Sequence, residues 1–196
     1  MKNIWKWACF ILIPNTLLSI YSLKWVMHTY EVREQIELCL GDLRDAETGV
    51  RGLIISKGDT KFLKPYSNAL QKIPAKFDRL QLLVSDNPRQ QEKIKLLCSE
   101  SLIKFKILNE VLNANQKGHT DEMTALIYQG KQVMDNIREL IRQMSKEETR
   151  LMLIRLKNAK YTYYWMIGSV VVLFLALLIQ SIQDYWNRKN MRHLSI

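Results

Sequence analysis

Residues 31–59 read EVREQIELCLGDLRDAETGVRGLIISKGD, and apolar side chains recur in this stretch at steps of four and three residues. This spacing places them in one row along an α-helix, which we call the apolar seam of the helix. The seam predicts a long helix over residues 24–57. A turn at Gly58 and Asp59 should follow, because glycine commonly ends a helix and aspartate commonly begins one. The seam contains one charged residue, and its members are Ile36, Leu40, Leu43, Glu47, Val50 and Ile54.

Three further segments show the same spacing and predict helices over residues 60–85, over residues 88–116 and from residue 120 onward. Asn87-Pro88 and Gly118 lie between them, where a helix cap, a first-turn proline and a terminal glycine are typical. Short turns between long helices favour antiparallel neighbours, so we expect an all-α, up-down-up-down four-helix bundle. The three seams are Tyr66, Leu70, Ile73, Phe77, Leu80, Val84; Ile94, Leu97, Ser101, Phe105, Leu108, Leu112; and Leu126, Gly130, Val133, Ile137, Leu140, Met144, Glu147, Leu151, Ile154.

Two uncharged stretches, residues 7–23 and residues 161–182, flank these helices. The second is long enough to cross the hydrocarbon core of a bilayer, and aromatic side chains lie at both of its ends, as at membrane interfaces. The first contains Pro14 and Asn15. It is either an uncleaved membrane helix, which we favour, or a cleaved signal peptide. We therefore expect the bundle to be flanked by two transmembrane helices. The predicted aromatic anchors are Trp5, Trp7, Tyr21, Trp25, Tyr161, Tyr163, Tyr164, Trp165, Tyr185 and Trp186.

Short basic flanks predict the orientation in the membrane, because such flanks stay on the cytoplasmic side. Residues 1–6 and the basic tail at residues 183–196 should be cytoplasmic, and residues 24–160 should be extracytoplasmic. The sequence thus predicts a two-pass protein of the inner (plasma) membrane. The basic residues that support this orientation are Lys2, Lys6, Arg188, Lys189 and Arg192.

Composition argues against several classes of function. The chain of 196 residues has a formal net charge of +10, but cations and acids are mixed along residues 24–160. We therefore expect no basic surface for nucleic acid. The three His are far apart in the sequence, and we find no nucleophile–base pattern, phosphate-binding loop or metal-ligand cluster. The expected protein is in contact with the lipid bilayer, is not an enzyme, and has no cofactor or metal.

A motif at the end of the first predicted helix resembles the CHASE3 family of extracytoplasmic sensor domains. Its core is D-x-E-T-G-x-R-G, then G-D, then F-L-x-P-Y. The motif residues, a possible switch or ligand cluster, are Asp45, Glu47, Thr48, Gly49, Arg51, Gly52, Gly58, Asp59, Phe62, Pro65 and Tyr66.

The resemblance implies a bacterial sensory domain between two membrane spans and, as is usual in the family, a homodimer. In such proteins an output module usually follows the second span, but only residues 183–196 follow it here. We therefore expect output through a separate kinase, cyclase or chemoreceptor. The alternative is a structural or accessory membrane subunit, whose bundle is a docking or spacer domain that binds no ligand.

Glu47 interrupts an apolar seam, and a buried carboxylate is costly unless it is paired. Arg51, one helical turn later, is the nearest candidate partner. The cluster has two interpretations, a polar contact that determines packing or a ligand pocket or switch point. For Gly49 and Gly52 we expect close helix approach, with a hinge as the alternative. From heights along the bundle, the further neighbours expected for Glu47 are Tyr66, Lys104 or Lys106, and Arg138.

Three other residues are predicted to have ordinary roles. Cys39 and Cys98 fall at similar heights on the first and third helices, which are diagonal in an up-down bundle, so free thiols are expected rather than a disulfide. Glu147 also interrupts a seam, and we expect it to face solvent or a second copy of the chain.

Overall fold

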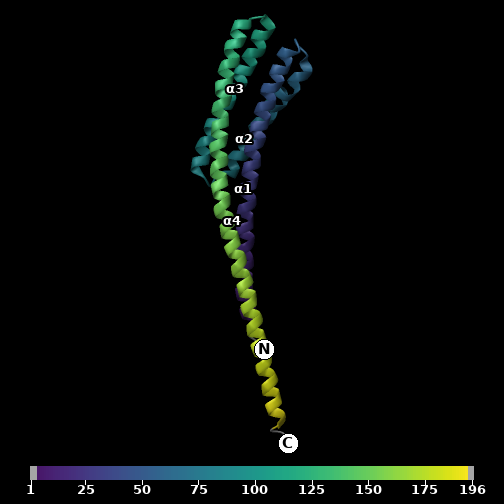
Figure 1. The fold of residues 1–196 in the computed structure, drawn as a ribbon, viewed down its shortest axis with the longest axis vertical. Coiled ribbons are helices and arrows are strands. Elements are labelled where there is room, and N and C mark those ends of the chain that lie inside the picture. The colour runs from purple at the N-terminus through teal and green to yellow at the C-terminus, as the bar shows by residue number, and fades with distance from the viewer. Residues whose placement is uncertain (1–3, 194–196) are drawn as a thin grey trace. The chain divides into compact units, whose positions relative to one another are not determined.

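The computed structural model describes the backbone of residues 4–193 and the side chains of residues 8–189. The described backbone is helical and contains no strand, which confirms the predicted all-α class. Predictions for the side chains of Lys2, Trp5, Lys6, Trp7 and Arg192 lie outside the described residues. The elements are α1 (Ile4–Ile55), the short 3-10 helix η1 (Thr60–Leu63), α2 (Lys64–Leu83), α3 (Pro88–Lys117) and α4 (Thr120–His193) (Figure 1).

The chain divides into two compact units, and we describe each by itself. The first is the helical domain, residues 28–151, and the second is the terminal helix pair, which the structure describes over residues 4–27 and 152–193. Both α1, with 52 residues, and α4, with 74 residues, are single unbroken helices. The predicted helix limits near residues 57, 60, 85, 88, 116 and 120 agree with the structure to within a few residues. The predicted start at residue 24 does not, because α1 begins at Ile4 and includes the first apolar stretch.

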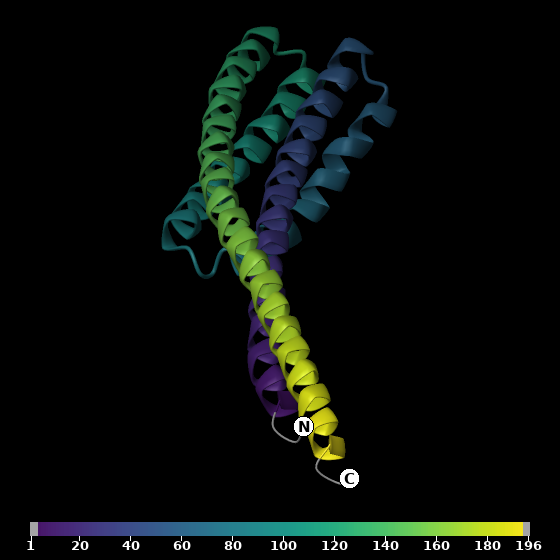
Figure 2. The ribbon, with the colours of Figure 1, turned by 60° about the horizontal axis from the view of Figure 1, so that its bottom comes forward.

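In the helical domain, α1 and α2 form an antiparallel hairpin (Figures 1 and 2). Lys76 of α2 pairs with Asp42 of α1 at 2.5 Å, and Arg79 pairs with Glu31. As the residue number rises along α2, its partner on α1 falls, which is the pattern of antiparallel neighbours. The two helices are therefore held together by ion pairs near the surface as well as by their packing in the core.

A second antiparallel hairpin joins α3 and α4. Lys104 of α3 reaches the carbonyl oxygen of Gly130 on α4, and Gln90 reaches the carbonyl oxygen of Met144. All four helices contribute side chains to one buried core, so burial of apolar surface holds the two hairpins together. Its most buried members include Ile36, Leu43, Leu80, Ile94, Leu97, Met134, Ile137 and Met144.

The predicted seams need two corrections. Leu70 is 49% exposed, and the neighbouring Ala69 is buried in its place. Along α4, the row Ile137, Ile141, Met144 and Glu148 is buried, whereas Leu140, Glu147 and Leu151 are only partly buried. The heptad prediction was wrong here because a straight α-helix has 3.6 residues per turn, so a strict 3.5-residue row drifts around it.

The turns follow from local sequence. After α1, the N–H of Gly58 donates to the carbonyl of Leu53 at 2.9 Å, and the N–H of Lys57 donates to that of Ile54. These two bonds form a Schellman motif. Lys57 occupies the left-handed position with φ 58°, and Gly58 follows with φ 107°, a region that suits glycine. The sequence assigned the helix stop to Gly58 alone, whereas the turn uses both residues.

The terminal helix pair carries its apolar side chains on the outside. Phe174 and Ile179 are each more than half exposed, and both helices are long and apolar enough to cross a membrane. Ser22 and Thr162 face each other with their hydroxyl oxygens 3.4 Å apart. Exposed apolar surface of this extent is typical of a segment that another apolar phase covers.

Cations lie over aromatic rings near both ends of the apolar stretch of α4. The Nζ atom of Lys160 is 5.8 Å from the ring centre of Tyr164, and that of Lys189 is 5.3 Å from the ring centre of Trp186. The guanidinium of Arg155 lies over the ring of Trp25 at 4.7 Å. This arrangement suits a membrane interface, where aromatic rings and basic side chains are enriched.

Candidate functional site

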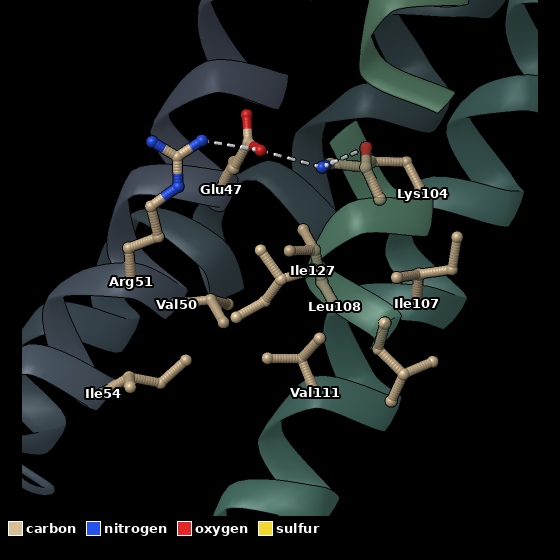
Figure 3. Close-up of a pocket in the computed structure, with 11 residues that line it drawn as sticks. Glu47, Val50, Arg51, Ile54, Lys104, Ile107, Leu108, Val111 and Ile127 are labelled. Atoms are coloured by element: carbon tan, nitrogen blue, oxygen red, sulfur yellow. Dashed lines mark hydrogen bonds and ion pairs between the residues drawn. The ribbon is translucent and has the colours of Figure 1, made fainter. Parts of the chain in front are cut away.

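Glu47 is the centre of a three-residue ionic cluster in the helical domain. Its Oε1 atom accepts from Arg51 at 2.8 Å and from the Nζ atom of Lys104 at 3.1 Å (Figure 3). The side chain of Lys104 is 2% exposed and that of Glu47 is 12% exposed. The cluster thus joins α1 to α3 through a lysine that is almost completely removed from water.

Lys104 also links α3 to α4. Its Nζ atom donates to the carbonyl oxygen of Gly130 at 2.9 Å. A Cβ atom at position 130 would lie 3.3 Å from that Nζ atom and 3.2 Å from a methyl group of Ile107. The absence of a side chain at Gly130 therefore lets the ammonium approach the backbone closely, and one buried cation contacts three helices.

Burial and pairing shift the ionisation of this cluster. Burial pushes the pKa of Glu47 upward, but the hydrogen bond from Arg51 and the charge and hydrogen bond of Lys104 outweigh it, so its pKa lies below the usual 4.5. Burial lowers the pKa of Lys104 from 10.5, and the charge of Glu47 offsets only part of that shift. The geometry thus stabilises the carboxylate more than it stabilises the ammonium.

The ionic cluster lies at one end of a small cleft between α1, α3 and α4. The cleft has a volume of about 30 Å³, enough for one or two water molecules. Figure 3 shows the charged groups on one side and apolar side chains on the other. The apolar lining residues are Val50, Ile54, Ile107, Leu108, Val111, Leu126 and Ile127.

The structure shows which of the two lysines predicted near Glu47 contacts it. Lys104 is in the cluster, whereas Lys106 is exposed and lies 3.9 Å from Glu110. Arg138 donates to Asp135 at 2.8 Å and lies close enough to lower the pKa of Lys104. The ring centre of Tyr66 lies 6.0 Å from that of Phe105 on α3, so this motif tyrosine packs against the core.

The motif glycines allow close approach between α1 and the segment that follows it. A Cβ atom at Gly49 would lie 2.6 Å from the carbonyl oxygen of Phe62, and one at Gly52 would lie 2.5 Å from the Phe62 ring. Real Cβ atoms essentially never come so close to another heavy atom. Both glycines therefore make room for Phe62 of η1, a close approach of the kind predicted from the sequence.

Other motif residues build the turn between α1 and α2. Asp59 caps η1 by accepting from the backbone N–H of Lys61 at 3.0 Å. Pro65 stands in the first turn of α2, where its missing N–H is not needed. Thr48 is exposed on α1. Asp59 and Pro65 thus shape the tip of the hairpin, and neither they nor Thr48 join the ionic cluster.

Asp45 lies on a different face of α1 from Glu47, because side chains two positions apart in an α-helix point in directions that differ by about 200°. It lines a wide surface cleft of about 380 Å³ between α1 and α2. Asp42 also lines it, opposite a row of exposed basic side chains, Lys61, Lys64 and Lys72. The structure therefore divides the motif among an inner ionic cluster, a structural turn and this outer cleft.

A second buried polar contact, between Gln90 and Glu148, does not follow from the predicted seams. The Nε2 atom of Gln90 donates to Oε1 of Glu148 at 2.9 Å and to the carbonyl of Met144 at 3.1 Å. Glu148 is 3% exposed, whereas Glu147 is partly exposed and pairs with Arg150. The buried carboxylate on α4 is therefore that of Glu148, one position after the Glu147 of the predicted seam. Glu148 is buried because the buried row of α4 drifts away from the strict heptad positions.

The two domain thiols lie in or beside the core. Cys39 is buried, and burial raises its pKa to about 12. Burial also raises the pKa of Cys98. Both are free cysteines, as expected. Among residues 8–189, whose side chains the structure describes, no group of three or more His, Cys, Asp or Glu is placed to hold a metal ion.

A comparison with protein families finds the CHASE3 domain at residues 22–158. The match covers well over half of the chain, and the chain belongs to the CHASE3 domain family, a sensory domain family of bacterial signalling proteins. Comparisons with curated proteins and with solved structures gave no match. This match confirms the family that the motif at residues 45–66 indicated.

Proposed function

We propose that this chain is a membrane-anchored, non-catalytic sensor that detects an extracytoplasmic stimulus and passes a helix shift to a signalling partner. In this proposal residues 24–160 form an up-down-up-down bundle outside the cytoplasm, and residues 7–23 and 161–182 cross the membrane. Both ends are cytoplasmic, and the working form is a homodimer. CHASE3 sensory domains usually work with signalling partners, and here the partner is a separate kinase, cyclase or chemoreceptor.

One observation carries the proposal. The helices α1 and α4 each include part of the domain core and an apolar stretch without a break. A continuous helix transmits a displacement along its axis better than a flexible linker does. The exposed apolar side chains and the aromatic–cation pairs of the terminal helix pair support a membrane environment for those stretches.

Topology is tested first, with cysteine reporters in intact cells. Ser67→Cys on α2 and Asn187→Cys near the end of α4 both replace exposed residues. The proposal expects a membrane-impermeant maleimide to label Ser67→Cys from outside, and Asn187→Cys only after permeabilisation. The unmodified chain, whose Cys39 is buried, gives the background. Labelling of Asn187→Cys from outside would overturn the orientation.

The partner is tested by purifying the tagged chain from its native membrane after mild cross-linking and identifying bound proteins by mass spectrometry. Recurrent recovery of a kinase, cyclase or chemoreceptor supports the sensor. Recovery of a transport, envelope or assembly complex would favour the accessory-subunit alternative. A matched sample with Arg188→Ala and Lys189→Ala tests whether the basic tail contributes to the contact.

A further inference from the structure

The cleft beside Lys104 combines charged side chains at one end with apolar walls. Lys104 and Arg51 are two cations against the single carboxylate of Glu47, so the cluster carries a net charge of +1. Glu47 compensates the buried Lys104, so the excess positive charge lies on Arg51, whose side chain is 59% exposed. A bound anion would pair with this second cation.

The donor count at the cluster leads to the same conclusion. The ammonium of Lys104 has three N–H bonds. Within the described part of the chain, Glu47 and Gly130 accept two of them. Arg51 uses one terminal nitrogen on Glu47, and its side chain is more than half exposed at the mouth of the cleft. An entering oxygen ligand would therefore find donors on both Lys104 and Arg51.

The rest of the cleft is apolar. Val50 and Ile54 of α1 face Leu108 of α3 and Ile127 of α4 across it, on the side away from the charged groups (Figure 3). Ile127 is 42% exposed, so this wall of the cleft is accessible from solvent. The charged end and the apolar walls together suit a small molecule with a charged head and a short apolar tail.

We propose that this cleft binds a small amphipathic monocarboxylate, with its carboxylate on Lys104 and Arg51 and its alkyl tail among Val50, Ile54 and Ile127. A monoanion matches the net charge of the cluster, and the apolar lining suits an alkyl tail. The present volume of about 30 Å³ is smaller than such a tail, so binding moves α1 away from α3 and α4.

The role of this ligand as the stimulus rests on the proposed function. In that function, α1 and α4 are the helices that carry a displacement through the membrane. Binding itself depends on neither the orientation nor the partner. If hexanoate binds and the topology differs from the proposal, the ligand site remains and the sensor role fails. If the topology and partner are as proposed and no probe binds, only the ligand site fails.

The experiment uses the full chain in lipid nanodiscs with labelled isoleucine methyl groups, followed by NMR. The probes are hexanoate, the neutral hexan-1-ol, hexylammonium and acetate. We expect saturable shifts from hexanoate at Ile54, Ile107 and Ile127, with Ile73 and Ile94 unaffected. Binding of each of the other three should be weaker by at least about tenfold, because each lacks the anionic head or the tail.

Variants assign the binding to the charged cluster. Lys104→Met should weaken hexanoate by at least about tenfold, whereas Lys106→Met, on the exposed face of α3, should leave it unchanged. Ile127→Trp fills the cleft and keeps the cluster, so it should abolish binding even if Lys104→Met folds poorly. The proposal is overturned if hexanoate and hexan-1-ol bind equally, if no probe shifts these methyl groups, or if Ile127→Trp binds hexanoate normally.

Discussion

The Nζ atom of Lys104 on α3 lies 3.1 Å from Oε1 of Glu47 on α1, and both atoms belong to side chains that are largely removed from water. The same Nζ atom donates to the backbone of Gly130 on α4. This contact links three helices at the end of the domain where the CHASE3 motif lies. Because a buried ion pair is sensitive to loss of either member, it allows direct tests.

Removal of Glu47 should destabilise the helical domain more than removal of Lys104. Glu47→Ala leaves a buried ammonium without its counter-charge and should lower the free energy of unfolding by about 3 kcal/mol. Lys104→Met leaves Glu47 paired with Arg51, and we expect a loss of about 1 kcal/mol. The measurement is urea unfolding of the nanodisc-embedded chain, followed by far-UV circular dichroism.

The double variant Glu47→Ala with Lys104→Met should be more stable than Glu47→Ala alone, since the unpaired charge is gone. Glu110→Ala is the surface control and should change stability by less than about 0.5 kcal/mol. An effect of Glu47→Ala as small as that of Glu110→Ala would contradict the buried-pair interpretation.

The lowered pKa of Glu47 predicts a loss of stability in acid. A carboxyl whose folded-state pKa lies below its unfolded value near 4.5 stabilises the fold above that value, and this stability is lost as the pH falls through the folded-state pKa. Glu47→Gln should therefore show a flatter decline of melting temperature below about pH 4.5 than the unmodified chain. Parallel curves would show that Glu47 does not titrate with folding.

The lowered pKa of Lys104 predicts a change in stability at alkaline pH. Its pKa in the folded state lies below 10.5, so the burial cost of the ammonium is present at neutral pH and is relieved as the pH rises towards 10.5. The unmodified chain should gain stability relative to Lys104→Met over that alkaline window. Melting curves of both chains between neutral pH and pH 10.5 measure the difference, and a constant difference would argue against a titrating lysine.

Gly49 and Gly41 lie in the same helix and should respond to alanine in opposite directions. A Cβ atom at Gly49 would collide with the backbone of Phe62, so Gly49→Ala should destabilise the domain by about 2 kcal/mol. Apart from the adjacent residues and the backbone of its own helix, no heavy atom lies within 4 Å of a Cβ atom at Gly41, so Gly41→Ala should stabilise the domain by about 0.5–1 kcal/mol. Thermal melting of the two variants side by side decides the matter, and equal shifts would argue against the close approach.

Glu148 and Glu147 are adjacent in sequence but differ in environment. Glu148→Ala removes a buried acceptor from Gln90 and should cost about 2 kcal/mol. Glu147→Ala breaks a pair with Arg150 near the surface and should cost less than about 1 kcal/mol. Chemical denaturation of both variants provides the comparison. A larger cost for Glu147→Ala would restore the original heptad assignment of α4.

Much of the domain was predictable because its signals are local. The helix limits follow from caps and breakers, such as Asn87 before Pro88 and the left-handed Gly118, whose effects act within a few residues. The early seams were also largely correct, since over two or three turns a heptad row and a real helix face hardly differ. The errors at Leu70 and along α4 arose where the rows were longer or where a small neighbour, Ala69, packed better.

The sequence by itself determined the all-α class, the helix order, the two apolar stretches and membership of the CHASE3 family, because these depend on residue spacing and on a motif. Only the tertiary structure decided that Glu47 pairs with Lys104 rather than with Lys106, that Glu148 rather than Glu147 is buried, and that Gly49 makes room for the backbone of Phe62. Such choices depend on the height and rotation of one helix against another. Side-chain packing across the whole core determines both.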